Sequence, residues 1–115
     1  MAEPTIDLAT FDELKQTAGA DFIAELVDAF LTEAPLLLDE LRRSFGAGDA
    51  DVFRRSAHSL KSNANTFGAR ALAAMARQLE LGGLAPVVQA NAQPLDALAE
   101  EYARVASALA GLRDG

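Results

Sequence analysis

The sequence predicts an all-α fold in a single domain. Half of its 115 residues are hydrophobic and only 6% are aromatic, a composition that suits packed amphipathic helices better than strands, in which β-branched and aromatic residues are enriched. Apolar residues also recur at helical spacing in several segments. A chain of this length builds one hydrophobic core. We therefore treat residues 1–115 as one domain, with residues 1–9 as an N-terminal tail.

A short first helix is expected after the tail. Thr10 is followed three residues later by Glu13, the pattern of a capping box, in which each side chain bonds a free backbone N–H of the other residue. The helix should therefore run over about 11–17 and end near Gly19.

A long second helix should follow, with Asp21 as its N-cap. Its apolar residues recur at helical spacing: Phe22, Leu26, Phe30, Leu37, Leu41 and Phe45. We expect its phenylalanines to belong to the core, together with Phe53 and Phe67 of the next helix. The glycines of the "GAGD" segment should end this helix, whereas Pro35 should bend it without ending it.

Two further helices are predicted to form an antiparallel hairpin over about 50–83. Asp49 or Asp51 can cap the first of them. The inward-facing residues are Val52, Phe53, Ala57, Leu60, Ala64 and Phe67 in the first helix and Leu72, Met75, Ala76 and Leu79 in the second. Gly68 marks a tight turn between them, and so short a link forces the helices to run in opposite directions.

The C-terminal segment predicts one more helix, which closes the bundle. After Pro94 its apolar residues follow a clear helical period: Leu95, Leu98, Tyr102, Val105, Leu109 and Leu112.

Composition and charge exclude several classes of function. Seventeen acids against ten bases give a formal charge of −7, which disfavours binding to nucleic acid or to anionic lipid surfaces. The chain has no cysteine and one histidine, so we expect no metal site. The N-terminus lacks the features of a signal peptide, and the most apolar stretch, 22–38, is interrupted by acids. We expect a monomeric cytoplasmic protein without membrane insertion.

The only histidine of the chain, His58, is predicted to face solvent. At 100° per residue it lies roughly 170° from the centre of the apolar stripe of its helix. Its neighbours on that outer face are polar or basic: Arg54, Lys61, Ser62 and Asn65. A passive surface side chain remains an alternative interpretation on spacing alone.

The segment around His58 is locally basic. Between Val52 and Leu79 there are five bases and none of the seventeen acids: Arg54, Arg55, Lys61, Arg70 and Arg77. We therefore expect an anionic partner to dock there. Nearby cations disfavour a protonated imidazole, and a neutral exposed imidazole is a nucleophile. Lys61 could also offset the charge of an incoming phosphoryl group.

Glu80 is a candidate for orienting the imidazole. It lies 12 residues after Gly68, and His58 lies 10 before it, so the two should be level within about one turn of the hairpin. A carboxylate that accepts the Nδ1–H would leave Nε2 free to attack. Spacing alone leaves open whether Glu80 points at His58 or is an ordinary surface acid at a helix end.

The segment "AHSLKSNANTFGARALAAMARQLE", residues 57–80, closely resembles the signature of histidine-containing phosphotransfer (HPt) domains, roughly H-x-L-K-G-x-x-x-x-x-G followed by L and then L-E. The residues in register are His58, Leu60, Lys61, Gly68, Leu72, Leu79 and Glu80. The likeness extends more loosely over nearly the whole chain. It implies an antiparallel four-helix bundle with a short additional N-terminal helix and an exposed acceptor histidine.

The resemblance also implies a function. His58 would accept a phosphoryl group at Nε2 from a receiver-domain aspartate, or from a kinase such as a hybrid histidine kinase, and pass it to another receiver aspartate. Lys61 would stabilise charge, and Glu80 would hold Nδ1. Arg54, Arg55, Ser62 and Asn65 would contact the receiver. Magnesium would belong to the receiver, so no cofactor is expected in this chain.

Ser62 departs from the signature, which has glycine there so that the receiver can approach closely. The hydroxyl could shift docking, or it could simply bond back to the His58 carbonyl. The chain lacks a glycine-rich nucleotide site, so it would be a carrier rather than a complete enzyme. A phosphate-free adaptor that docks a receiver or kinase is the competing interpretation, and the chain could also be a domain of a longer hybrid kinase.

Overall fold

The computed structural model describes residues 5–114, and within this range the chain forms helices and no strand. The expectation of an all-α fold is thus confirmed. Residues 1–4 of the expected N-terminal tail lie outside the described residues. The helices are α1 (Leu8–Ala18), α2 (Ala20–Ala47), α3 (Ala50–Thr66), α4 (Arg70–Gly82), α5 (Leu84–Gln89) and α6 (Gln93–Asp114).

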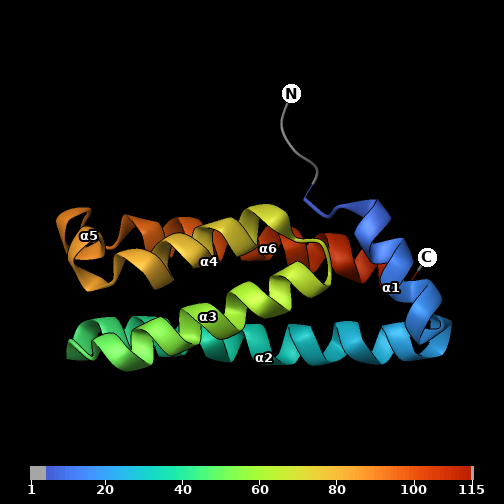
Figure 1. The fold of residues 1–115 in the computed structure, drawn as a ribbon, viewed down its shortest axis with the longest axis horizontal. Helices are drawn as coiled ribbons and strands as arrows, with labels where there is room; N and C mark the ends of the chain where they lie inside the picture. The colour runs from blue at the N-terminus through green and yellow to red at the C-terminus, as the bar shows by residue number, and fades with distance from the viewer. Residues whose placement is uncertain (1–4, 115) are drawn as a thin grey trace.

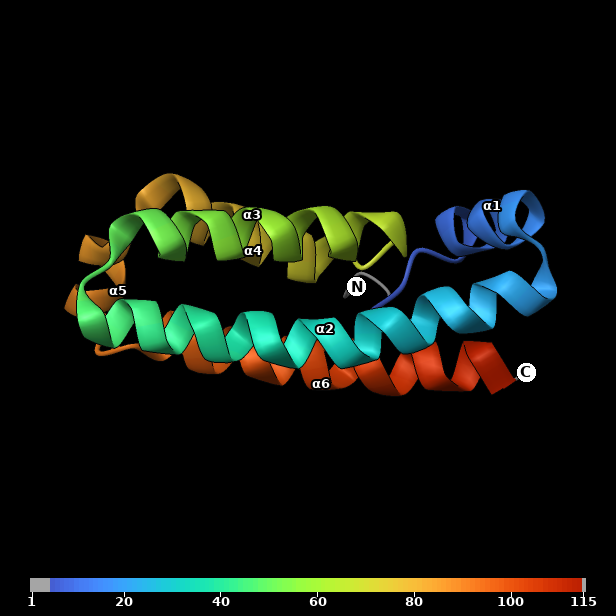
Figure 2. The same ribbon diagram turned by 90° about the horizontal axis from the view of Figure 1, so that it is seen from below.

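Four of the helices, α2, α3, α4 and α6, lie side by side, and each runs opposite to the previous one (Figures 1 and 2). The hairpin predicted over about 50–83 corresponds to α3 and α4, which pack against each other along their length. Helix α1 packs at one end of the bundle and α5 lies at the other end (Figure 1). The sequence pattern did not predict α5, a helix of six residues. No helix within residues 5–114 is both long and apolar enough to span a bilayer.

The cap of α1 differs from the prediction. Asp7, not Thr10, is the N-cap, because an Asp7 carboxylate oxygen accepts the backbone N–H of Ala9 at 3.2 Å. The Thr10 hydroxyl donates to the other oxygen of the same carboxylate at 2.9 Å. Helix α1 therefore begins at Leu8, inside the range expected as tail, and ends at Ala18 before Gly19.

Helix α2 also begins differently. Gly19 is its N-cap, with no side-chain hydrogen bond, and Asp21 lies within the first turn, so the prediction that Asp21 caps the helix was wrong. The helix continues through Pro35 as expected. Proline has no N–H to bond the carbonyl of Leu31 four residues earlier, and the Tyr102 hydroxyl of α6 approaches that carbonyl at 3.5 Å.

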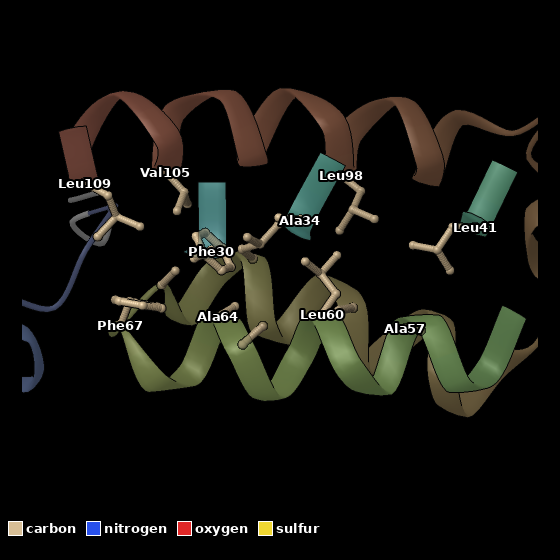
Figure 3. Close-up of a cluster of buried hydrophobic side chains, with 14 of the residues drawn as sticks. Phe30, Ala34, Leu41, Ala57, Leu60, Ala64, Phe67, Leu98, Val105 and Leu109 are labelled. Carbon is tan, nitrogen blue, oxygen red and sulfur yellow. The ribbon is translucent and has the colours of Figure 1, made fainter. Parts of the chain in front are cut away.

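The core fills the space between the four long helices. Figure 3 shows side chains of α2, α3 and α6, among them Phe30, Leu60 and Leu98, in the space between these helices. The Phe30 and Phe67 rings pack with their centroids 5.2 Å apart. Phe22 is the exception among the phenylalanines expected in the core. It is 51% exposed, and its neighbour Ile23 is buried instead. The buried face of α2 is the one that packs against the other helices, whatever the size of the side chains on its other faces.

Helix α3 is fixed at both ends, by a side-chain cap at its start and, at its end, by contacts between the α3–α4 turn and the N-terminal segment. Asp49 caps α3 by accepting the N–H of Val52 at 3.2 Å. At the other end of α3, Gly68 has a positive φ of 79°, and its carbonyl accepts the backbone N–H of Asp7 at 2.8 Å. Arg70, the first residue of α4, forms an ion pair with the Asp7 carboxylate. The segment before α1 therefore anchors the tip of the hairpin.

Candidate functional site

His58 lies on the outer side of α3, and its side chain is 57% exposed. Ala57, which precedes it, and Leu60, two residues after it, are completely buried on the opposite face of the helix. These two contacts hold α3 against the bundle with the imidazole directed to solvent, because residues of one helix share a face only at three- or four-residue spacing.

Glu80 of α4 joins His58 and Lys61 through one carboxylate. Its Oε2 lies 2.7 Å from His58 Nδ1, and its Oε1 accepts a hydrogen bond from Lys61 Nζ at 2.7 Å. The Glu80 side chain is only 15% exposed, and Lys61 is 23% exposed. The structure thus brings together the three residues to which the resemblance assigned a part in phosphotransfer, across the two helices of the hairpin.

The hydrogen bonds of Glu80 determine the chemistry of the ring. A carboxylate is an acceptor, so its partner Nδ1 carries the hydrogen, and in the neutral ring Nε2 then holds the lone pair. Nε2 is the nitrogen that Glu80 leaves free. The hydrogen bonds from Lys61 and then His58 lower the pKa of Glu80 below its usual value of 4.5, so the carboxylate is ionised near neutral pH.

The expected docking residues are exposed, but the basic ones are not free. Arg54 and Arg55 both pair with Asp51, at 2.9 and 3.2 Å. The acid-free segment that we identified in the sequence begins at Val52, immediately after Asp51, so its charge count did not include this acid. The hairpin is therefore less basic than its sequence predicted.

Ser62 and Asn65 are exposed on the same helix. Within residues 5–114 the Ser62 hydroxyl does not bond the His58 carbonyl. Instead, the Ser62 carbonyl accepts the Thr66 hydroxyl at 3.1 Å. Ser62 is exposed and lines the same surface hollow as His58, at the position where the signature has glycine.

Two hollows border His58 on opposite sides of α3. The first, which we call the α2 hollow, has a volume of about 440 Å³ and lies between α2 and α3. Besides His58, it is lined by Glu33, Leu36, Leu37, Glu40, Ser62 and Asn63, among others. The second, the arginine hollow, has a volume of about 360 Å³ and is lined by Arg54, Arg55, Ser59 and Glu80 in addition to His58.

The residues that α2 contributes were missed by the sequence reasoning. Glu33, Leu36 and Glu40 recur at three- and four-residue spacing and therefore share one helical face. This pattern could have indicated an exposed face with an apolar residue between two acids. It could not show that the face lies beside His58, because that depends on how α2 packs against α3.

Metal ligands are not clustered in the structure. Among residues 5–114 there is no group of three or more histidine, cysteine, aspartate or glutamate side chains that could hold a metal ion.

Comparison with known proteins identifies the fold and the family. Residues 25–113, which include α3, α4 and almost all of α2 and α6, match the family described as Hpt domain. The chain belongs to the Hpt domain family. Hpt domains carry phosphoryl groups in phosphorelays and typically interact with receiver domains.

A solved structure supports the assignment. The crystal structure of histidine-containing phosphotransfer protein B (HptB) from Pseudomonas aeruginosa PAO1 superposes with a TM-score of 0.88 at 25% sequence identity. The match covers 98% of this Hpt domain and 97% of HptB. No curated protein sequence matches the chain.

Proposed function

We propose that His58 is the phospho-acceptor of this Hpt domain. It takes a phosphoryl group from a receiver-domain aspartate, or from a kinase, and passes it to another receiver aspartate. The observation that carries the proposal is the exposed imidazole whose Nδ1 is bonded to Glu80 at 2.7 Å, which leaves Nε2 as the nitrogen available for attack. Residues 1–115 act as one domain in this proposal.

The transfer step follows from the orientation of the ring. The Nε2 lone pair attacks phosphorus, an N–P bond forms, and the P–O bond to the receiver aspartate breaks, so the aspartate leaves as a carboxylate. Nδ1 keeps its hydrogen, and the phosphorylated ring is therefore cationic. Glu80 stabilises this charge through its hydrogen bond to Nδ1. The reverse attack by a second aspartate then displaces a ring that Glu80 already holds in place.

Lys61 supplies positive charge beside the transferred group. Its ammonium lies on the same helix face as His58, one turn away, and bonds Glu80. The three equatorial oxygens of a phosphoryl group in transfer carry negative charge, and a nearby ammonium stabilises that charge. Magnesium would be bound by the receiver. Arg54, Arg55, Ser62 and Asn65 are the residues of α3 that we expect to contact the receiver.

Phosphotransfer to a His58→Gln variant tests the proposal. A receiver domain phosphorylated with a radioactive label is mixed with the wild-type chain and with the variant. We expect an acid-labile, base-stable label on the wild type only, because the glutamine amide has no nucleophilic nitrogen. A Ser107→Ala variant, altered at an exposed serine of α6 outside both hollows that contain His58, is the control and should take label normally. Label on the glutamine variant would assign the acceptor to another residue.

The same experiment addresses the adaptor interpretation. An adaptor would bind the receiver and take no label, either as wild type or as variant. That outcome, with the wild-type chain folded, would contradict the carrier function.

A further inference from the structure

The surface around His58 is divided by charge. The α2 hollow, on one side of the ring, has two acids, Glu33 and Glu40, and no base among its lining residues. The arginine hollow, on the other side, has two bases, Arg54 and Arg55, and one acid, Glu80, which is already bonded to His58 and Lys61. A protein whose aspartyl phosphate reaches Nε2 of His58 covers both hollows, because the ring borders each of them.

Leu36 is the apolar part of the α2 hollow. It is 61% exposed and is one of five large apolar side chains of the described residues that face solvent. The other four are Leu8, Phe22, Leu81 and Val88, and none of them lines a hollow that contains His58. A side chain packed in a desolvated pocket near the centre of a contact surface contributes more binding energy than the residues at its edge.

The charges of the two hollows differ in how firmly they are held. Glu40 accepts a hydrogen bond from Ser56 at 2.7 Å, so it is fixed at the floor between α2 and α3. Glu33 is exposed. Among the described residues, Arg54 and Arg55 bond only Asp51, in pairs whose side chains are more than half exposed. Exposed pairs of this kind contribute roughly 0–1 kcal/mol, so carboxylates of a partner can replace Asp51.

We propose that this division of charge determines which receivers dock and in which orientation. The α2 hollow receives an apolar side chain of the receiver flanked by a basic residue, which pairs with Glu33. The arginine hollow faces the acidic side of the receiver that carries the phosphoaspartate. Complementary charge on both sides of the ring speeds association with the correct partner and opposes a receiver docked in the reverse orientation. This inference rests on the proposed function of His58.

Two substitutions on α2 test the proposal, each with a matched control. Leu36→Asp removes the apolar anchor, and Val88→Asp changes a side chain of α5 that is equally exposed, at 61%. Glu33→Lys reverses the charge of the exposed acid in the α2 hollow. Glu25→Lys makes the same change at an exposed acid of the same helix outside the hollow. None of the four residues belongs to the group that holds or orients His58.

Two phosphoryl donors separate docking from chemistry. The first is the receiver domain of the source organism that labels the wild-type chain fastest, in its phosphorylated form. The second is phosphoramidate, a small donor that needs no docking surface.

With the receiver, we expect Leu36→Asp to slow transfer at least tenfold. Glu33→Lys should slow it severalfold, with a weaker dependence on salt than the wild type shows. Both controls should match the wild type, and phosphoramidate should label all five proteins equally.

The outcomes distinguish the two proposals. If Leu36→Asp and Glu33→Lys behave like their controls with the receiver while phosphoramidate labels His58, the docking proposal is wrong and the function of His58 stands. If neither donor labels His58 in the wild type, the proposed function itself is wrong. If Leu36→Asp loses labelling with phosphoramidate too, Leu36 acts on the imidazole rather than on docking, which also overturns the inference.

Discussion

At the scale of single residues, the site depends on the Glu80 carboxylate, which bonds both His58 and Lys61. A carboxylate beside an imidazole orients the ring by accepting the hydrogen of one ring nitrogen, which leaves the lone pair of the neutral ring on the other nitrogen. Lys61 bonds the other oxygen of the same Glu80 carboxylate and offsets its charge. The same carboxylate therefore orients His58 through one oxygen and holds Lys61 beside the ring through the other.

Removal of the orienting carboxylate should slow phosphotransfer without abolishing it. In a Glu80→Ala variant, Nδ1 loses its partner and Nε2 is no longer favoured as the free nitrogen. We expect a loss of roughly 10- to 100-fold, the range found when partners that orient ligating histidines are removed. Timed transfer assays with a labelled receiver measure it. Glu25→Ala, at an exposed acid of α2, is the control, and equal rates for the two variants would contradict the role of Glu80.

The pKa of Glu80 predicts how stability depends on pH. Its pKa is lowered in the folded chain, first by Lys61 and then by His58. A lowered pKa stabilises the fold above the unfolded value of about 4.5, and this contribution is lost as the pH falls through the folded value. The wild type should therefore be more stable than Glu80→Gln at pH 7, and the difference should shrink below pH 4.5. Urea unfolding measures this, and a difference that stays constant into acid would contradict it.

At the scale of elements, the α3–α4 turn holds the two halves of the site in register. His58 is on one helix of the hairpin and Glu80 on the other, so a shift of one helix by a single turn of about 5.4 Å would separate them. Gly68 sets this register because it adopts a positive φ and contacts the backbone of Asp7. The N-terminal segment thereby supports a site that it does not touch.

Substitution of Gly68 should destabilise the fold. A Cβ at this position would lie 2.8 Å from the Asp7 carbonyl oxygen, and the positive φ alone costs an L-residue about 1–2 kcal/mol. We expect Gly68→Ala to lower the free energy of unfolding by at least that amount. Gly46→Ala, in the helical part of α2 with nothing within 4 Å, should raise it by about 0.5–1 kcal/mol. Chemical denaturation of both variants checks the contrast, and equal effects would argue against the role of the turn.

At the scale of the whole molecule, the bundle presents the imidazole by burying the opposite face of its helix. The side chains of α2, α3, α4 and α6 meet in one core (Figure 3). Packing of this kind, rather than the propensity of each helix, supplies most of the stability of a helical domain. Because the core holds α3 in place, the residues on its outer face are not needed for packing and are available for binding.

Two substitutions on α3 should separate stability from function. Leu60→Ala creates a cavity at a completely buried position and should lower the free energy of unfolding by about 2–5 kcal/mol. His58→Gln, at an exposed position, should change it by no more than about 0.5 kcal/mol while removing phosphotransfer. Thermal or urea unfolding provides the measurement. A large destabilisation by His58→Gln would mean that its loss of label reports unfolding.

The helical period located several features correctly because it depends on local geometry alone. It placed Leu60 inside and His58 outside on one helix, and Gly68 was recognised as a turn because glycine accepts a positive φ readily. The cap of α1 was misplaced because Asp7 and Thr10 both fit a cap, and only the path of the chain before α1 selects Asp7. Phe22 was placed in the core because apolar character does not show which face of a helix the bundle covers.

The sequence by itself determined that this chain is helical, that its histidine lies opposite an apolar stripe, and that the order of residues from 57 to 80 resembles that of HPt domains. These features arise within one helix or one hairpin, where spacing along the chain corresponds directly to spacing in three dimensions. The tertiary structure decided that Glu80 bonds both His58 and Lys61 and that α2 places Leu36 beside the ring. Contacts between helices depend on their rotation and packing about the shared core, which no local period along the chain specifies.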